Sequence, residues 1–260
     1  MGFDWPFFWH YLLRPSSAYL NGLMLTLVLS VVAQTLGTAV GLFAALARMS
    51  RLKPLQLLVR GYVWIMRGTP LLVQIVFIYT GLAAGGIFRF EDISLGILTI
   101  PGNVQAGLVA LSLNEGAYMA EIIRAGIASV DSGQTEAAKS LGMTYGLLMR
   151  RIVLPQAARF VVPPLGNEFN AMLKNTTLVS VIGVPELLLT TETLTSATFR
   201  VFELYAVVAL YYLTLTTLWS LVQTRIEESF GKPTAQVEAA ASFGERLFGR
   251  TLARAVRAKK

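Results

Sequence analysis

Long stretches of this chain contain no charged residue, and four of them are about as long as a membrane-crossing helix, which needs roughly 20 residues. These stretches are residues 15–47, 68–88, 93–114 and 204–224. The third helix is expected to begin after the helix breakers Pro101 and Gly102 and to continue toward Glu121. A fifth apolar region, residues 156–184, contains only three charged side chains. The pattern therefore predicts an all-α membrane protein with about five transmembrane helices.

Composition agrees with this prediction. Hydrophobic residues make up 54% of the chain and charged residues 14%, against about 25% charged residues in soluble domains. The chain has no cysteine, which excludes disulfides, thiolate metal sites and a cysteine nucleophile. The net charge of +7 is dispersed along the chain, which is typical of basic loops beside membrane helices and does not favour a nucleic-acid partner.

Lysines and arginines fall mainly in the loops of one side of the predicted membrane domain. Only Arg14, Arg89 and Arg200 lie in loops of the opposite side, while Arg67 and Lys174 lie within spans. Because cytoplasmic loops are enriched in basic residues, the N-terminus is predicted outside and the C-terminus in the cytoplasm.

Three segments follow from this arrangement. Residues 1–17, which include the single histidine, His10, and many aromatic side chains, form a periplasmic interfacial segment or else a hydrophobic plug against neighbouring helices. Residues 18–224 form the transmembrane domain. Residues 225–260 form a basic cytoplasmic tail, which is either an amphipathic helix on the membrane surface or a solvated extension.

A polar loop, residues 126–155, separates the third and fourth predicted spans and is long enough for two short helices. Ser132 or Thr135 can cap the first of them, which places Glu136 in the first turn, where a negative charge is favourable. Gly142 can end that helix. The pattern predicts a short, rigid helix on the cytoplasmic side.

Small side chains on this predicted helix suit close contact with a partner. Ala137 and Ala138 are expected on its surface, with Glu136 and Lys139 available for charged contacts at the rim. The alternative interpretation is an ordinary amphipathic connector between two membrane helices.

The loop also contains a recognisable motif. Glu136-Ala137-Ala138 is followed by three residues, Gly142, nine residues, and Ile152-Val153-Leu154-Pro155. This spacing resembles the signature of ABC importer permeases. Five further segments resemble the polar amino acid branch of that family, namely residues 67–74, 118–124, 155–157, 173–178 and 186–187, so that the resemblance covers roughly residues 22–222.

The resemblance implies a transmembrane permease subunit of an ATP-driven importer for polar amino acids in the bacterial inner membrane. It implies that the coupling loop, through Glu136, Ala137, Ala138 and Gly142, fits a groove of a cytoplasmic ATP-binding subunit. The implied partners are two such ATP-binding subunits, a second permease subunit that is identical or related, and a periplasmic or lipid-anchored solute-binding protein, with membrane lipids around the helices.

The chain has no sequence motif for hydrolysing ATP. A Walker loop needs the pattern GxxxxGK[ST], and the only Gly-Lys pair, Gly231-Lys232, is followed by Pro233. His10 has no companion metal ligands or triad partners nearby in the sequence. We therefore expect no enzymatic activity, cofactor or metal in this chain, with ATP and Mg²⁺ bound by the partner subunit.

Polar side chains within the spans are candidates for a substrate pathway, because a charge near the bilayer centre costs about 2.5–3.5 kcal/mol and normally faces a bundle interior or an aqueous cavity. These candidates are Gln34, Arg67, Glu121, Glu168, Lys174 and Asn175. Glu121 can instead pair with Arg124 on one helix face, and Gln34 can instead bond a neighbouring helix.

Glu168 and Lys174 lie about 120° apart around an ideal helix and therefore do not simply pair with each other. They suit the two charges of a zwitterionic amino acid, or ion pairs with another subunit. The resembling family often has aspartate at the position of Asn175, which argues against a strictly cationic substrate.

Two other functions remain open from the sequence. Intramembrane charges alone also fit a secondary transporter or channel that works without an ATPase partner, although the complete loop motif argues against it. An ABC permease for another small solute, such as an opine, shares all of these features.

Overall fold

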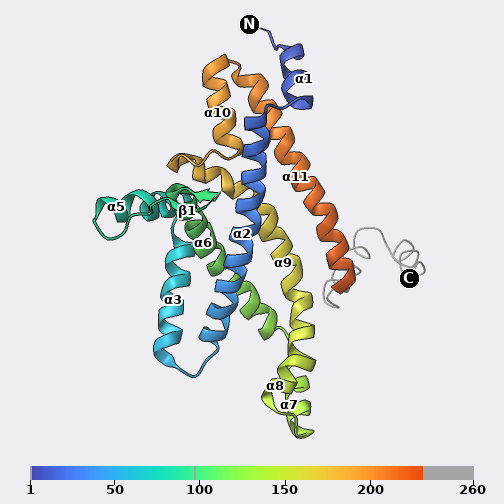
Figure 1. Ribbon diagram of the computed structural model, residues 1–260. Coiled ribbons are helices and arrows are strands. Elements are labelled where there is room, and N and C mark those ends of the chain that lie inside the picture. The colour runs from blue at the N-terminus through green and yellow to red at the C-terminus, as the bar shows by residue number, and fades with distance from the viewer. Residues whose placement is uncertain (1, 97, 231–260) are drawn as a thin grey trace, which may run out of the picture. The chain divides into compact units, whose positions relative to one another are not determined.

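The computed structural model describes residues 2–96 and 98–230, and these residues are mostly helical (Figure 1). They belong to two compact units, Met1–Ala125 with Pro164–Leu221, and Gly126–Pro163 with Val222–Lys260. The expected tail lies largely outside the described residues, since α11 (Val201–Phe230) is their last element.

The first unit contains a long helix, α2 (Ser17–Arg48), and most of a second one, α11. Both are long and apolar enough to cross a membrane. The remaining elements are α1 (Trp5–Leu13), α3 (Lys53–Gly68), α4 (Leu71–Val76), a π-helical turn η1 (Phe77–Gly81), α5 (Leu82–Ala84), β1 (Ile93–Leu95), β2 (Leu98–Ile100), most of α6 (Gly102–Ala128), part of α9 (Leu154–Asn175), a 3-10 segment η3 (Thr176–Ile182) and α10 (Leu187–Thr198).

Two bent pairs of helices raise the number of candidate spans among the described residues from two to as many as four. One pair joins α3 to Leu71–Ala84 at a bend of 110°, and the other joins Tyr145–Ile182 to α10 at 53°. The third span was predicted to begin after Pro101 and Gly102; the helix found there, α6, begins at Gly102 itself and runs to Ala128, but α6 is not among the candidate spans. The count of five spans and the place of the polar loop between them therefore stay predictions.

The expected second span, residues 68–88, is wrong as a single helix. Thr69 adopts an extended conformation, with φ −120° and ψ 147°, because the ring of Pro70 disfavours helical geometry in the residue before it. Pro70 also lacks the N–H that would continue the helix. The chain therefore turns by 110° at this point before α4 begins.

The prediction of an all-α fold needs a smaller correction. β1 and β2 form an antiparallel pair in which Ile93 lies opposite Ile100 and Ser94 opposite Thr99. Gly96 in the connecting turn has a φ of 69°, a conformation that glycine adopts without a steric penalty. The charge-free stretch 93–114 thus divides into a hairpin and the start of α6.

Helix packing in the first unit centres on α2, which contacts α10 and α3 (Figure 1). Small side chains dominate its buried face, as in membrane helices whose backbones approach closely. These residues are Gly22, Thr26, Ser30, Ala33, Gly37, Gly41, Ala44 and Ala45. At Gly41 an added Cβ would lie 2.4 Å from Cβ of Met119 on α6, so this contact excludes any larger residue.

The N-terminal helix α1 combines both alternatives that the sequence left open. Phe8 is buried against Tyr19, Leu187 and Val207, whereas Trp5 and Trp9 expose 59% and 50% of their surface. One face of α1 therefore packs against other helices of the first unit and the other remains available to a membrane interface.

The second unit contains α7 (Ser132–Ser140), α8 (Tyr145–Leu148), a π-helical turn η2 (Met149–Val153) and the beginning of α9. Leu148, Val153 and Ala157 are buried. The two short helices expected in the polar loop are therefore present.

Candidate functional site

The helix that carries the loop motif, α7, has its N-cap one residue before Ser132 and four residues before Thr135, the two predicted caps. Asp131 is the N-cap, and its side chain accepts a hydrogen bond from the N–H of Gly133 at 2.7 Å. The prediction of Ser132 or Thr135 as the cap is thus wrong, and Glu136 lies in the second turn rather than the first. Asp131 takes the position because a carboxylate accepts from a free N–H more strongly than a hydroxyl does.

Gly142 ends α7 as expected. Its φ is 76°, its N–H bonds Lys139 O at 2.9 Å, and the N–H of Met143 bonds Ala138 O at 3.1 Å. This pair of bonds is the Schellman arrangement, which favours glycine at its left-handed position. The end of the helix is therefore held in one geometry.

The two alanines of the motif differ in exposure. Glu136, Ala137 and Lys139 are exposed, but Ala138 exposes only 2% of its surface. The expectation that Ala138 lies on the surface is therefore wrong, because that side of α7 packs within its own unit. Leu141 at the end of α7 exposes 83% of its surface, an unusual exposure for a large apolar side chain at a helix end.

Gln34 takes the alternative role that the sequence left open, a bond between helices. It is 6% exposed, and its Nε2 donates to Oε1 of Glu115 on α6 at 2.7 Å. Gln34 and Glu115 thus connect α2 with α6.

Glu121 pairs with Arg124 as predicted, since its Oε2 accepts from Nε at 3.0 Å and from Nη2 at 2.9 Å. A second partner, Arg48 at the end of α2, also forms an ion pair with Glu121. The sequence did not reveal Arg48, which was assigned to a loop. With two arginines on one carboxylate, Glu121 joins α2 and α6.

Arg67 and Glu168 lie within electrostatic range of each other, and the guanidinium of Arg67 lies 5.1 Å from the ring centre of Tyr118. Lys174 is exposed and Asn175 is half-buried. Among the described residues no hydrogen bond or ion pair involves the side chains of Glu168, Lys174 or Asn175.

Gln74 and Asn114 form a network that the sequence analysis did not identify. Nε2 of Gln74 donates to Met66 O at 2.8 Å, Thr69 O at 3.1 Å and Thr69 Oγ1 at 2.8 Å. Asn114 Nδ2 donates to Oε1 of Gln74 at 3.0 Å. The bend before Pro70 leaves carbonyl oxygens without helical donors, and this network supplies the missing donors.

Glu186 is a second buried carboxylate that was not a predicted site. It is the N-cap of α10 and is fully buried. Four donors surround it, namely Leu188 N at 2.9 Å, Leu189 N at 2.8 Å, Tyr212 Oη at 3.0 Å and Thr26 Oγ1 at 3.5 Å. The sequence signals for it were its position before a run of apolar residues and the resemblance of residues 186–187 to the permease family.

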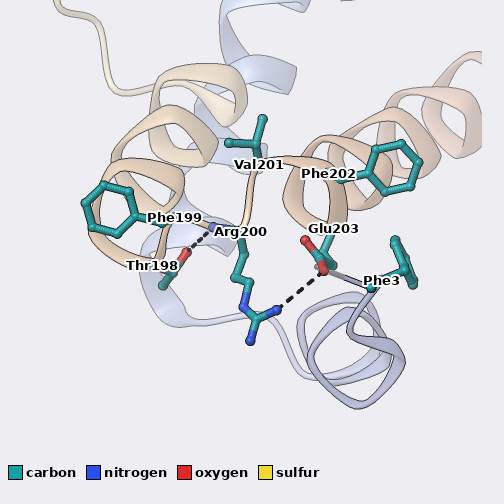
Figure 2. A pocket seen from close by; sticks show the side chains of 8 residues that line it. Phe3, Thr198, Phe199, Arg200, Val201, Phe202 and Glu203 are labelled. Atoms are coloured by element: carbon teal, nitrogen blue, oxygen red, sulfur yellow. Dashed lines mark hydrogen bonds and ion pairs between the residues drawn. The ribbon is translucent and has the colours of Figure 1, made fainter.

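An open pocket lies between the N-terminal residues and the α10–α11 connection, around Phe3 and residues 198–203. Figure 2 shows Arg200 at its centre. The backbone N–H of Arg200 donates to Oγ1 of Thr198, and its guanidinium is directed toward the carboxylate of Glu203. Arg200 also pairs with Asp4 at 3.0 Å. None of the predicted site residues lines this pocket. In the described part of the chain no group of three His, Cys, Asp or Glu side chains could hold a metal ion.

Comparisons with known proteins cover most of the chain. The family described as "Binding-protein-dependent transport system inner membrane component" matches residues 37–232. The probable glutamine ABC transporter permease protein GlnM of Bacillus subtilis (strain 168) is 39% identical over 218 residues, which are 82% of this chain and 95% of that protein. The octopine transport system permease protein OccM of Rhizobium radiobacter is 39% identical over 229 residues, or 87% and 90% of the two chains. A solved structure described as "Crystal structure of an amino acid ABC transporter with histidines" matches with a TM-score of 0.77 and 41% identity, over 88% of this chain and 100% of that one.

Proposed function

Since the chain belongs to the family of binding-protein-dependent transport system inner membrane components, we propose that it is the transmembrane subunit of an ATP-driven importer for polar amino acids or their derivatives. The names of GlnM and OccM and the description of the solved structure support this substrate class. Because one relative is named as an octopine permease, the proposed substrates include opines. No observation favours a secondary transporter or channel.

The observation that carries the coupling part of the proposal is the geometry of α7. Glu136, Ala137 and Lys139 are exposed on a helix whose end is fixed by Gly142, next to the highly exposed Leu141. A short rigid helix with apolar and charged side chains at its surface is suited to insertion into a groove of a partner. Ala138 supports this helix from within its own unit.

In this function the chain works with partners and does not hydrolyse ATP itself. Two ATP-binding subunits hold ATP and Mg²⁺ on the cytoplasmic side, a second permease subunit, identical or related, completes the pathway, and a solute-binding protein delivers the substrate from outside. The N-terminus and residues 1–17 lie outside, residues 18–224 form the membrane domain with its coupling loop at about 126–155, and residues 225–260 are cytoplasmic.

The proposed pathway includes Arg67, Glu168, Lys174 and Asn175. Glu168 and Lys174 have no hydrogen-bond or ion-pair partner among the described residues, which suits groups that bind a zwitterionic solute and release it again. Gln34 and Glu121 bond other helices and act first as links between α2 and α6.

The test is reconstitution in lipid with the ATP-binding subunit and solute-binding protein encoded beside this chain, with ATP hydrolysis and uptake measured for each common amino acid. Glu136→Arg is expected to abolish stimulation of ATP hydrolysis by the loaded binding protein, whereas Glu228→Arg, the same charge reversal at another exposed site, is expected to leave it unchanged.

Gly142→Ala is expected to lower this stimulation of ATP hydrolysis, because alanine is strained at a φ of 76°. Its control is Gly146→Ala, where an added Cβ meets no atom within 4 Å.

Uptake by the isolated chain along an ion gradient, without an associated ATPase, would show that the importer proposal is wrong. If Glu136→Arg and Glu228→Arg change the stimulation of ATP hydrolysis equally, the assignment of α7 as the coupling helix is wrong.

A further inference from the structure

The pocket at the α10–α11 connection has a volume of about 730 Å³ and is built from residues of the first unit alone (Figure 2). Arg200 and Glu203 line it, and Asp4 pairs with Arg200 at 3.0 Å. These three charged side chains belong neither to the proposed substrate pathway nor to α7. Their role is therefore not explained by the proposed function.

The pocket lies at the ends of two candidate membrane spans, α2 and α11. Val201, the first residue of α11, lines it. The beginnings of the two spans pack together, because the ring centres of Tyr19 on α2 and Tyr211 on α11 lie 5.3 Å apart. Tyr211 Oη also donates to Leu12 O of α1 at 3.1 Å, and α1 carries exposed tryptophans, which are typical of a membrane interface. The pocket therefore lies at the level of lipid headgroups.

Large apolar side chains around the pocket are exposed. Phe199, Val201 and Phe202 expose 85%, 56% and 73% of their surface. Phe199 also has a φ of 56°, in the left-handed region that bulky residues rarely adopt, and it ends α10 at a position where glycine is favoured. A phenylalanine that is strained and almost fully exposed gains little from this fold, so its ring suits contact with the apolar part of a bilayer.

The charged groups of the pocket have unused bonding capacity. The guanidinium of Arg200 has five N–H donors, and its ion pairs within the described residues are with Asp4 at 3.0 Å and Glu203 at 3.8 Å. Glu203 is 5% exposed. Its Oε1 accepts from the N–H of Asp4 at 2.8 Å, whereas its Oε2 has no hydrogen bond or ion pair among the described residues. Two carboxylates and one guanidinium carry a net charge of −1, which suits a ligand with one anionic and one cationic group.

We propose that this corner binds the headgroup of a membrane phospholipid of the phosphatidylethanolamine type, which carries a phosphate and an ammonium group. Arg200 binds the phosphate, because a guanidinium matches phosphate geometry. Glu203 and Asp4 accept hydrogen bonds from the ammonium, which has three N–H donors. Phe199 and Phe202 contact the first methylene groups of the acyl chains. The pocket volume lies within the range of about 300–1,000 Å³ that is usual for small-molecule sites.

The proposal depends only on the chain spanning a membrane, and it holds whichever solute is imported. Native mass spectrometry of the delipidated full chain tests it, with phosphatidylethanolamine, phosphatidylcholine and phosphatidylglycerol of identical acyl chains as probes. Phosphatidylcholine keeps the phosphate, but its quaternary ammonium has no N–H donor, and phosphatidylglycerol has no ammonium. Phosphatidylethanolamine is expected to bind about tenfold more tightly than either, as for a charge-assisted hydrogen bond.

Two variants separate headgroup binding from folding. Arg200→Gln is expected to lower the affinity for phosphatidylethanolamine about tenfold, whereas Arg89→Gln, at an exposed arginine of the same unit, is expected to leave it unchanged. Phe199→Gly is expected to lower the affinity for all three lipids about fivefold through lost apolar contact. Its melting temperature should stay constant or rise, since glycine adopts a φ of 56° without strain. Phe88→Gly, which removes another exposed ring of this unit, is expected to leave the affinity unchanged.

Equal affinity of the wild type for the three lipids overturns the proposal. Unchanged affinity in both Arg200→Gln and Phe199→Gly also overturns it, and if Arg200→Gln fails to fold, unchanged affinity in Phe199→Gly is sufficient. Tighter binding of phosphatidylglycerol overturns the assignment of a headgroup with an ammonium. If the lipids bind equally and Arg200→Gln abolishes association with the solute-binding protein, the corner is a protein-docking surface and the lipid site is wrong.

Discussion

Two buried glutamates of the first unit both lie against α2, yet their surroundings differ. Glu186 is fully buried and Glu115 is 4% exposed. Four donors point at the Glu186 carboxylate, namely the N–H groups of Leu188 and Leu189 and the hydroxyls of Thr26 and Tyr212. Glu115 receives one bond, from Gln34.

This difference separates a carboxylate with a full set of hydrogen-bond donors from one that is short of donors. A buried charge with a full set of donors makes a stable junction, and Glu186 joins α2, α10 and α11 in this way. A buried charge without them is costly unless a ligand completes it, and such groups concentrate at functional sites. The same helix, α2, presents Gly22 and Thr26 to Glu186, and Gly37 and Gln34 to Glu115.

The largest effect on stability is expected for Glu186→Gln. The amide nitrogen would face donors that now point at a carboxylate oxygen, so we expect a loss of about 3 kcal/mol in the free energy of unfolding. Thermal unfolding of the purified chain in lipid nanodiscs measures this loss. Glu192→Gln on the same helix should unfold like the wild type, and equal stability of Glu186→Gln and Glu192→Gln would contradict the structural role of Glu186.

Gly37→Ala tests the other carboxylate. The new methyl group would displace Glu115, whose Cβ and Cγ would lie only 2.6 Å away, and overpacking of this kind costs about 2 kcal/mol. Thermal unfolding and amino acid uptake are both expected to fall. Gly61→Ala on α3 is the control, because nothing lies within 4 Å of its Cβ and alanine favours a helix; a similar loss in both variants would contradict the close contact at Gly37.

Local features of the chain were predictable from the sequence. Gly142 was expected to end α7 and Glu121 to pair with Arg124, and the structure confirms both; α6 was expected to begin after Pro101 and Gly102 and begins at Gly102 itself. Each depends on residues within one or two turns of one another, where spacing alone decides the contact.

Contacts between distant helices were not predictable. Gln34 meets Glu115 across 81 positions and Thr26 meets Glu186 across 160, and no periodicity encodes such pairs. The bend before Pro70 was missed because hydropathy continues through it. The difference between the two buried glutamates thus depends on tertiary structure, and mutations across helices are needed to test it.

Thr26→Val removes the hydroxyl that connects α2 with Glu186 and with the N–H of Leu187. Oγ1 of Thr26 accepts from the N–H of Leu187 at 3.2 Å, and valine would leave that N–H buried without a partner, at a cost of about 1 kcal/mol. Thermal unfolding measures the loss. Thr35→Val on the exposed side of α2, where the hydroxyl bonds only Val31 O, should have almost no effect; an equally small effect at Thr26 would show that Leu187 finds another acceptor.

Ser112→Ala is expected to have the smallest effect, and with the opposite sign. Its hydroxyl is buried without a hydrogen-bond partner, so its removal relieves a desolvation penalty and should raise the free energy of unfolding by up to about 1 kcal/mol in the absence of substrate. Ser30→Ala is the control, because Ser30 is also buried but its Oγ donates to Thr26 O at 2.7 Å, and its removal should bring no gain. A loss of stability in Ser112→Ala would mean that the hydroxyl already has a partner without substrate.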